Sequence, residues 1–158
     1  MVKVIMHGCN GKMGQTISSL IAADKEIEIV AGIDAVNSGK NDYPVFSSIS
    51  ECTVAADAVI DFSVAAAVDG LLDYCVEKKL PCVLCTTGLS EAQLQKVQEA
   101  SKQVAVLKSA NMSLGINMLL KLLKEAAKTL SPAGFDIEIV EKHHNQKLDA
   151  PSGTALAL

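Results

Sequence analysis

His7-Gly8-Cys9-Asn10-Gly11-Lys12-Met13-Gly14 is the stretch of sequence that decides the fold. It follows an apolar run, Val2–Met6, that is typical of a buried strand, and it leads into Met13–Ala23, where apolar residues recur at helical spacing. Three glycines at intervals of three, between a strand and a helix, let backbone N–H groups approach a pyrophosphate at the helix N-terminus. Glycines also form plain tight turns. The position at the first strand-to-helix junction favours dinucleotide binding over a plain turn.

Strand-like and helix-like segments continue to alternate up to about residue 110. Further strands are expected at Glu28–Ile33, Ala58–Phe62, Cys82–Cys85 and Val104–Leu107, helices at Ser63–Lys79 and 90–102, and a polar loop at Ala35–Tyr43. The second of these helices opens with a capping-box pattern, Ser90-Glu91-Ala92-Gln93. Strands that alternate with helices pair in parallel through right-handed crossovers. The predicted fold class is α/β, a Rossmann-type doubly wound parallel sheet that forms a dinucleotide-binding domain over residues 1–110.

The pattern changes in the C-terminal third of the chain. A long amphipathic helix is expected at Leu114–Leu130, ended by Ser131-Pro132, and a further helix opens at Ser152. Between them Asp136–Glu141 alternates between apolar and acidic residues, as a half-exposed strand of antiparallel type does. We therefore expect residues 111–158 to begin an α+β substrate domain with a mixed sheet, and we expect this domain to be incomplete at Leu158.

Composition excludes several classes of protein. Hydrophobic residues make up 49% and charged residues 20% of the 158 residues, which is typical of a globular protein and excludes a disordered tail. A net charge of −4 and an aromatic content of 3% argue against a nucleic-acid partner. We expect a cytoplasmic protein, because no apolar stretch is long enough to span a membrane and no signal-peptide pattern precedes the first strand.

The five cysteines are odd in number and irregular in spacing. Cys82 and Cys85 form a C-x-x-C pattern, but no helix begins at the second cysteine and no further metal ligands lie nearby in the sequence. Buried, reduced thiols are therefore favoured over a redox or metal site.

Polar residues follow the expected strands where a ligand crevice would lie. Asp34 ends the second strand twenty residues after Gly14, where an acidic residue accepts hydrogen bonds from the adenosine ribose, although a surface aspartate can also simply end a strand. Asp61-Phe62-Ser63 and Thr86-Thr87-Gly88 follow two later strands, either as crevice residues or as caps and turn formers.

The segment Glu141-Lys142-His143-His144-Asn145-Gln146-Lys147-Leu148-Asp149-Ala150-Pro151-Ser152-Gly153-Thr154-Ala155 carries the densest set of chemically active side chains. Histidine can donate a proton near neutral pH, lysine can hold an anion, and the N–H groups that open a helix after Ser152 suit a carboxylate. Zinc binding is the competing interpretation. Adjacent histidines point apart in an extended chain, and no cysteine or carboxylate lies at a familiar ligand spacing, so no metal is expected.

This segment, E-x-H-H-x-x-K-x-D-A-P-S-G-T-A, resembles the signature of the dihydrodipicolinate reductase (4-hydroxy-tetrahydrodipicolinate reductase) family. Four other segments match the family pattern in the same order: Gly8–Gly14, Asp61–Ser63, Thr86–Gly88 and a hinge segment, Ser109–Asn117. Cys85 stands where the family usually has glycine, and Lys12 replaces the commoner arginine. Family members continue well past residue 158, so we expect this chain to be truncated and to show little reductase activity by itself.

The resemblance implies an NAD(P)H-dependent reductase that converts an unsaturated ring dicarboxylate into tetrahydrodipicolinate, on the diaminopimelate route to lysine. It implies that His143 is the general acid, Lys147 is a second donor, and His144, Gly153 and Thr154 hold the carboxylates. Family members are typically homotetramers. The cofactor-binding residues that it implies are Gly8, Cys9, Asn10, Gly11, Lys12, Met13 and Asp34 at the adenosine and pyrophosphate end, and Cys85, Thr86, Thr87, Ser109, Ala110, Asn111 and Met112 toward the nicotinamide and the hinge.

NADH should be preferred and NADPH tolerated, because Asp34 repels a 2′-phosphate and all 14 cationic residues are lysines, which cannot clamp a phosphate as arginine does. Two other functions stay open. One is a different Rossmann oxidoreductase on a small acid, such as a homoserine or aspartate dehydrogenase, against which the His-His-x-x-Lys loop argues. The other is a non-catalytic nucleotide-binding module, such as a sensor.

Overall fold

The computed structural model describes residues 1–36, 39–145, 147 and 150–158, which form two compact units, Met1–Ser109 and Ala110–Leu158. Asn37 and Ser38 of the expected polar loop, and Gln146, Leu148 and Asp149 of the family signature, lie outside the described residues. None of the described helices is long and apolar enough to cross a membrane.

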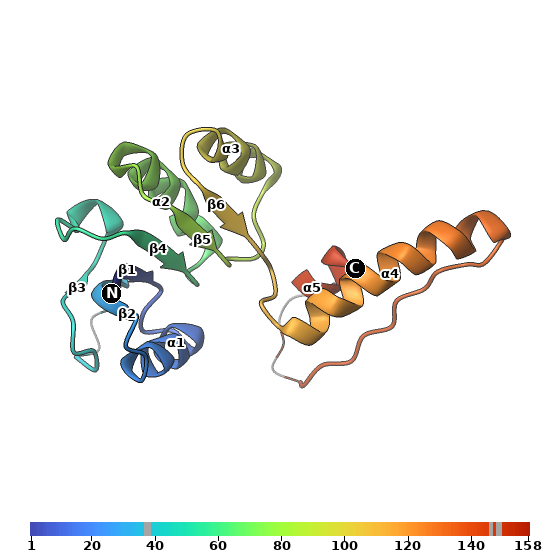
Figure 1. The fold of residues 1–158 in the computed structure, drawn as a ribbon, viewed down its shortest axis with the longest axis horizontal. Coiled ribbons are helices and arrows are strands. Elements are labelled where there is room, and N and C mark those ends of the chain that lie inside the picture. Colours follow the sequence, from blue (N-terminus) through green and yellow to red (C-terminus); the bar gives the residue numbers. More distant parts are fainter. Residues whose placement is uncertain (37–38, 146, 148–149) are drawn as a thin grey trace. The chain divides into compact units, whose positions relative to one another are not determined.

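The first unit contains a six-stranded sheet in which all neighbouring strands are parallel. Its strands are β1 (Val2–His7), β2 (Ile27–Ile33), β3 (Val45–Phe46), β4 (Ala58–Asp61), β5 (Cys82–Leu84) and β6 (Val106–Lys108). Their order, β3-β2-β1-β4-β5-β6, is that of a doubly wound fold with its switch point between β1 and β4 (Figure 1). The predicted fold class is confirmed. The two-residue strand β3 was not predicted.

Helices cover both faces of this sheet. They are α1 (Lys12–Ala22), the 3₁₀ turn η1 (Ile49–Glu51), α2 (Ala65–Lys78) and α3 (Glu91–Ser101). Successive residues of β1 belong to different cores: Val4 and Met6 pack with α1, and Ile5 packs in the larger core with α2 and α3. Because side chains alternate along a strand, His7 points to the same face as Ile5. Both faces of β1 are thus covered, as is typical of a parallel sheet.

The start of α3 follows from its sequence. The Ser90 hydroxyl accepts a hydrogen bond from the Gln93 N–H at 3.3 Å, and the Gln93 side-chain oxygen accepts one from the Ser90 N–H at 3.0 Å. The predicted capping box is therefore formed. It satisfies two backbone donors that would otherwise lack partners in the first helical turn.

The second unit consists of helices and irregular segments in its described part. α4 (Leu114–Leu130) has the predicted bounds, η2 (Ser131–Ala133) follows it, and α5 (Gly153–Ala157) begins after Ser152 as predicted. The prediction of a strand at Asp136–Glu141 is wrong, because these residues form no strand. A strand needs a hydrogen-bonded neighbour, and the described part of this unit contains no other strand, so the expected mixed sheet is also absent from it.

Candidate functional site

The loop after β1 is shaped by glycines that this backbone requires. Gly8 has a φ of +81°, and a Cβ atom there would lie 2.5 Å from the carbonyl oxygen of Phe62. A Cβ atom on Gly14 would lie 2.2 Å from the carbonyl oxygen of Gly8. These two glycines allow α1 to start close against the end of β1. A Cβ atom on Gly11 would make only an ordinary contact, at 3.4 Å from the carbonyl oxygen of Gly8. The fold itself therefore leaves room for a side chain at this position.

Gly11 is the N-cap of α1 and provides no side-chain hydrogen bond to the first helical turn. The backbone N–H groups of this turn are therefore available to an anion, which the helix dipole also favours. Gly11 also lines a cavity of about 510 Å³. A glycine that packing does not demand, at the start of a helix and beside a cavity, suits the close approach of a phosphate group.

Asp34 connects the end of β2 to this loop. One oxygen of its carboxylate accepts the Asn10 N–H at 3.0 Å, and the other accepts the Val36 N–H at 3.2 Å. Each carboxylate oxygen can accept a further hydrogen bond. The cavity lies at the switch point of the sheet, and its lining comes from the ends of β1, β2 and β4 and from α2, including His7, Gly8, Gly11, Asp34, Ser48 and Ser63. In doubly wound folds a nucleotide binds at this point.

A buried polar cluster lies at the ends of β1, β4 and β5. Asp61 is fully buried, and one of its oxygens lies 2.8 Å from His7 Nδ1 and accepts the Ser63 hydroxyl at 2.6 Å and the Ser63 N–H at 3.2 Å. Its other oxygen accepts the Thr86 hydroxyl at 2.6 Å. Burial alone would raise the pKa of the Asp61 carboxyl, but the hydrogen bonds from His7, Ser63 and Thr86 outweigh it and hold this pKa below its usual value.

The remaining predicted cofactor residues of the first unit differ in accessibility. Lys12, Met13 and Thr87 are exposed, whereas Cys9, Cys85 and Thr86 are buried. Burial, followed by the nearby Asp34 carboxylate, raises the pKa of Cys9 to about 11, and burial and Asp61 do the same for Cys85. All five cysteines are buried and free, as predicted. Cys9 is completely buried, so its contribution to a ligand site would come from its backbone.

The hinge residues fall at the junction of the two units. The Ser109 N–H donates to the Leu84 carbonyl at 3.1 Å and so continues the edge of the sheet. Ala110 and Met112 are exposed. The Asn111 side chain donates to the Thr154 hydroxyl at 3.0 Å, within the second unit. Asn111, predicted to lie near the nicotinamide, therefore contacts a residue predicted to hold substrate.

Glu141 organises the loop that carries the predicted catalytic residues. One of its carboxylate oxygens accepts the Ser152 N–H at 2.9 Å, and the other lies 3.6 Å from His143 Nδ1. Hydrogen bonds from Ser152, followed by the charges of His143 and Lys147, lower the pKa of Glu141. His143 and His144 are exposed, and the Lys147 N–H donates to the His144 carbonyl at 3.2 Å.

Ser152 begins α5 in the way that the sequence predicts. Its hydroxyl accepts the Ala155 N–H at 3.0 Å, and Gly153 and Thr154 are half-buried. The loop thus holds a histidine, a carboxylate and the first turn of a helix within a short distance of one another. Glu141 was quoted in the sequence only as part of a motif, and its two contacts could not be read from spacing.

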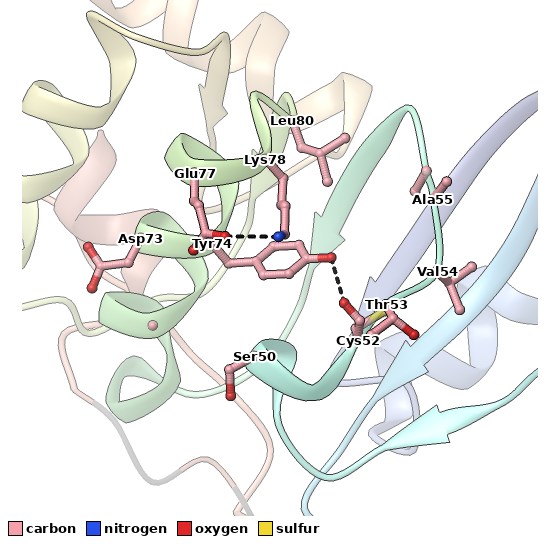
Figure 2. A pocket seen from close by; sticks show the side chains of 12 residues that line it. Ser50, Cys52, Thr53, Val54, Ala55, Asp73, Tyr74, Glu77, Lys78 and Leu80 are labelled. Atoms are coloured by element: carbon pink, nitrogen blue, oxygen red, sulfur yellow. Dashed lines mark hydrogen bonds and ion pairs between the residues drawn. The ribbon is translucent and has the colours of Figure 1, made fainter.

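A second cavity, of about 670 Å³, lies beside the C-terminal half of α2 (Figure 2). The Tyr74 hydroxyl donates to the Cys52 carbonyl at 3.1 Å, and burial raises the pKa of Tyr74 to about 12. Because α2 runs away from the carboxyl ends of the strands, this cavity lies toward their amino ends, and none of the predicted site residues line it.

The strand order, the glycine loop and Asp34 at the switch point are those of a Rossmann-type, nucleotide-binding fold. Residues 2–112 match the profile of the dihydrodipicolinate reductase N-terminus, and residues 115–158 match that of its C-terminus. The chain therefore belongs to the dihydrodipicolinate reductase family.

Individual relatives agree with this assignment. The 4-hydroxy-tetrahydrodipicolinate reductases of Caldanaerobacter subterraneus subsp. tengcongensis and Clostridium tetani are 54% and 51% identical over 158 residues, which is 100% of this chain and 62% of theirs. A dipicolinate-bound dihydrodipicolinate reductase from Paenisporosarcina sp. TG-14 has a similar structure, with a TM-score of 0.77 at 30% identity over 99% of this chain and 63% of that chain. The chain thus spans about three fifths of the length of these relatives.

Proposed function

We propose that this chain supplies the dinucleotide-binding domain and the catalytic loop of an NAD(P)H-dependent reductase that converts 4-hydroxy-tetrahydrodipicolinate into tetrahydrodipicolinate, on the diaminopimelate route to lysine. The observation that carries this proposal is the loop around Glu141, in which His143 and the start of α5 share one carboxylate. The match to the family over both units supports it. Residues 1–110 would bind the cofactor, and residues 111–158 would begin the substrate domain.

The cavity at the switch point fits one end of a dinucleotide. Gly8 and Gly11 leave the backbone accessible, the first turn of α1 offers N–H groups to the pyrophosphate, and Asp34 has acceptor capacity for ribose hydroxyls. When bound, the cofactor supplies a hydride to the substrate. The Thr86 hydroxyl already donates its hydrogen to Asp61. Thr86 would therefore contact the cofactor through its backbone, or its hydroxyl oxygen would accept a hydrogen bond from the cofactor.

Asp34 supports a preference for NADH. A 2′-phosphate on the ribose would face its carboxylate, and two like charges a few ångströms apart cost about 1 kcal/mol in water and several times more where water is partly excluded. No arginine exists in the chain to offset this repulsion, and the exposed Lys12 offers only a point charge. NADPH would therefore be tolerated and NADH preferred.

Loss of the 4-hydroxyl group of the substrate as water would give the unsaturated ring that accepts the hydride. His143 would then donate a proton to the ring carbon next to the site of reduction. Glu141, ionised at neutral pH and 3.6 Å away, would hold the orientation of the imidazole ring. Lys147 would act as a second donor, and His144, Gly153 and Thr154 would hold the two carboxylates of the substrate. Movement at the hinge, Ser109–Ser113, would close the two domains over the substrate and so exclude water from the reaction.

Assembly and location complete the proposal. At the full length of its relatives, the protein would form a homotetramer through the substrate domain and work in the cytoplasm. Exposed apolar side chains on α4, such as Leu114 at 87% exposure, support this assembly. A helix with an apolar face gains stability when another part of the protein or a second copy buries that face.

The test is substrate-dependent NADH oxidation by a chain extended to the length of its relatives, for instance a chimera in which the C-terminal remainder of a relative follows residue 158. We expect steady NADH oxidation with 4-hydroxy-tetrahydrodipicolinate, and, in a parallel assay, no reduction of NAD⁺ with homoserine or aspartate. NADH binding without oxidation would favour a non-catalytic nucleotide-binding module. Reduction of NAD⁺ with one of the other acids would favour a different Rossmann oxidoreductase.

A further inference from the structure

His7 is a buried residue that lines the cavity at the switch point and that no sequence motif indicates. It is the last residue of β1, directly precedes Gly8, and has 5% of its surface exposed. Its Nδ1 atom lies 2.8 Å from Asp61. Within the described part of the chain its other ring nitrogen, Nε2, makes no hydrogen bond, and His7 is one of the residues that line the cavity of about 510 Å³. One ring nitrogen of this cavity-lining residue is thus held by the protein, and the other is not.

Asp61 determines which nitrogen is held. Its carboxylate accepts hydrogen bonds from Ser63 and Thr86 as well as from His7, and these bonds favour the ionised carboxylate, which can only accept. His7 Nδ1 must therefore carry a hydrogen and donate it to Asp61. This leaves Nε2 as the atom that can interact with a ligand, and the short Nδ1 contact fixes the orientation of the ring.

The surroundings of the cavity indicate which part of a dinucleotide His7 would meet. The next residue, Gly8, and Gly11 belong to the loop suited to a pyrophosphate. His7 is the one basic side chain among the described residues that line this cavity, and Asp34 is an acidic one. Backbone N–H groups can bind a pyrophosphate, but they do not neutralise its charge, so a protonated imidazole next to the loop would supply what the cavity otherwise lacks.

We propose that His7 is a further cofactor-binding residue, whose Nε2–H donates to the pyrophosphate of the bound dinucleotide, and that Asp61 is the positioning residue that holds its ring. This inference rests on the proposed function, because it assumes that a dinucleotide occupies the cavity. Protonation gives Nε2 the hydrogen that it donates.

The alternative is a purely structural role, in which His7 only satisfies Asp61. The variant that separates the two roles is His7→Asn. Its side-chain amide keeps an N–H donor near the position of Nδ1 and lacks any atom in the place of Nε2. A matched control is Tyr74→Phe, which removes a different buried hydrogen bond, to the Cys52 carbonyl, beside the cavity that contains no predicted site residue (Figure 2).

The experiment uses the 158-residue chain and measures dissociation constants for NADH, ADP and adenosine by calorimetry. We expect His7→Asn to raise the constants for NADH and ADP about tenfold or more, the usual effect of losing a hydrogen bond to a charged group, and to change the constant for adenosine less than about twofold. Tyr74→Phe should change none of the three. Unchanged binding of NADH and ADP by a folded His7→Asn chain would overturn the proposal, and so would equal weakening of ADP and adenosine.

A measurement on the parent chain covers the case in which His7→Asn does not fold. The chain has three histidines, so the imidazole nitrogens can be followed individually by NMR. ADP should shift the His7 Nε2 resonance and adenosine should not; no shift with saturating ADP would overturn the proposal. If the parent chain binds NADH and the His7→Asn substitution does not change that binding, the proposed function stays intact. No binding of NADH or ADP by the parent chain would overturn both.

Discussion

Asp61→Asn offers a test of the buried polar cluster, because it removes the charge and keeps the shape of the side chain. The Asp61 carboxylate accepts four hydrogen bonds, three on one oxygen and one on the other. Asparagine can keep its oxygen toward His7 and Ser63 and turn its NH₂ group toward the Thr86 hydroxyl. Every hydrogen bond then survives as a neutral one.

The expected cost follows from this comparison. A hydrogen bond to a charged group contributes about 1.5–3 kcal/mol and a neutral one about 0.5–1.5 kcal/mol, so four weakened bonds amount to about 4 kcal/mol. Removing a charge that is costly to bury offsets part of this loss. We therefore expect Asp61→Asn to lower the free energy of unfolding of the first unit by about 2–3 kcal/mol.

Urea unfolding followed by tyrosine fluorescence measures this change. The chain has no tryptophan, and both tyrosines, Tyr43 and Tyr74, lie in the first unit, so the signal does not report on the second. The control is Asp69→Asn, which removes an exposed carboxylate 3.6 Å from Lys96 and should cost less than about 0.5 kcal/mol. A loss for Asp61→Asn no larger than that for Asp69→Asn would refute the argument.

The same cluster predicts a dependence on pH. Because the pKa of Asp61 is lower in the folded chain than in the unfolded chain, its contribution to stability is fully present above the unfolded value, about 4, and is lost as the pH falls through the folded value. The difference in unfolding free energy between the parent chain and Asp61→Asn should therefore be constant near neutral pH and shrink below about pH 4. A difference that grows in acid would contradict this sign.

Three further results are expected. With pKa values of about 11, the buried thiols of Cys9 and Cys85 should react with a disulfide reagent at neutral pH only after urea unfolds the chain, and rapid modification of the folded chain would contradict their burial. NADH should bind at least about fivefold more tightly than NADPH, and Asp34→Asn should narrow that ratio; tighter binding of NADPH by the parent chain would exclude the proposed repulsion. In the extended chain, His143→Ala and Lys147→Ala should each lower kcat by about 10²–10⁴-fold and leave the dissociation constant of NADH unchanged; near-normal kcat in either variant would remove that residue from the mechanism.

Local features of the fold could be predicted from sequence where a short pattern determines them. The bounds of α4 were predictable because a capping serine, Ser113, starts the helix and Ser131-Pro132 ends it. β3 was missed because Val45–Phe46 is too short to show any periodicity. The alternation at Asp136–Glu141 was misleading, because a pattern indicates which face of a strand is apolar but does not supply the neighbouring strand that it needs.

The candidate site was predictable to a similar extent. The glycine loop and Asp34 could be predicted as site residues because their spacing follows from the geometry of a strand, a turn and a helix. The contact between His7 and Asp61 was missed because these residues are 54 positions apart and meet only through the register of two parallel strands. Glu141 likewise belongs to a recognisable motif. Its hydrogen bond with the Ser152 N–H could not be predicted, because that bond depends on how the loop folds back.

The central claim is that the first unit binds a dinucleotide through its glycine loop and Asp34 and that the loop around His143 uses this cofactor in a reduction. Substrate-dependent oxidation of NADH, compared between the 158-residue chain and the extended chain, tests it most directly. We predict saturable NADH binding by both chains, steady oxidation with 4-hydroxy-tetrahydrodipicolinate by the extended chain, and little or none by the shorter one, in which residues such as Ile137 and Ile139 remain exposed. An extended, folded chain that binds NADH but does not oxidise it with this substrate would contradict the account.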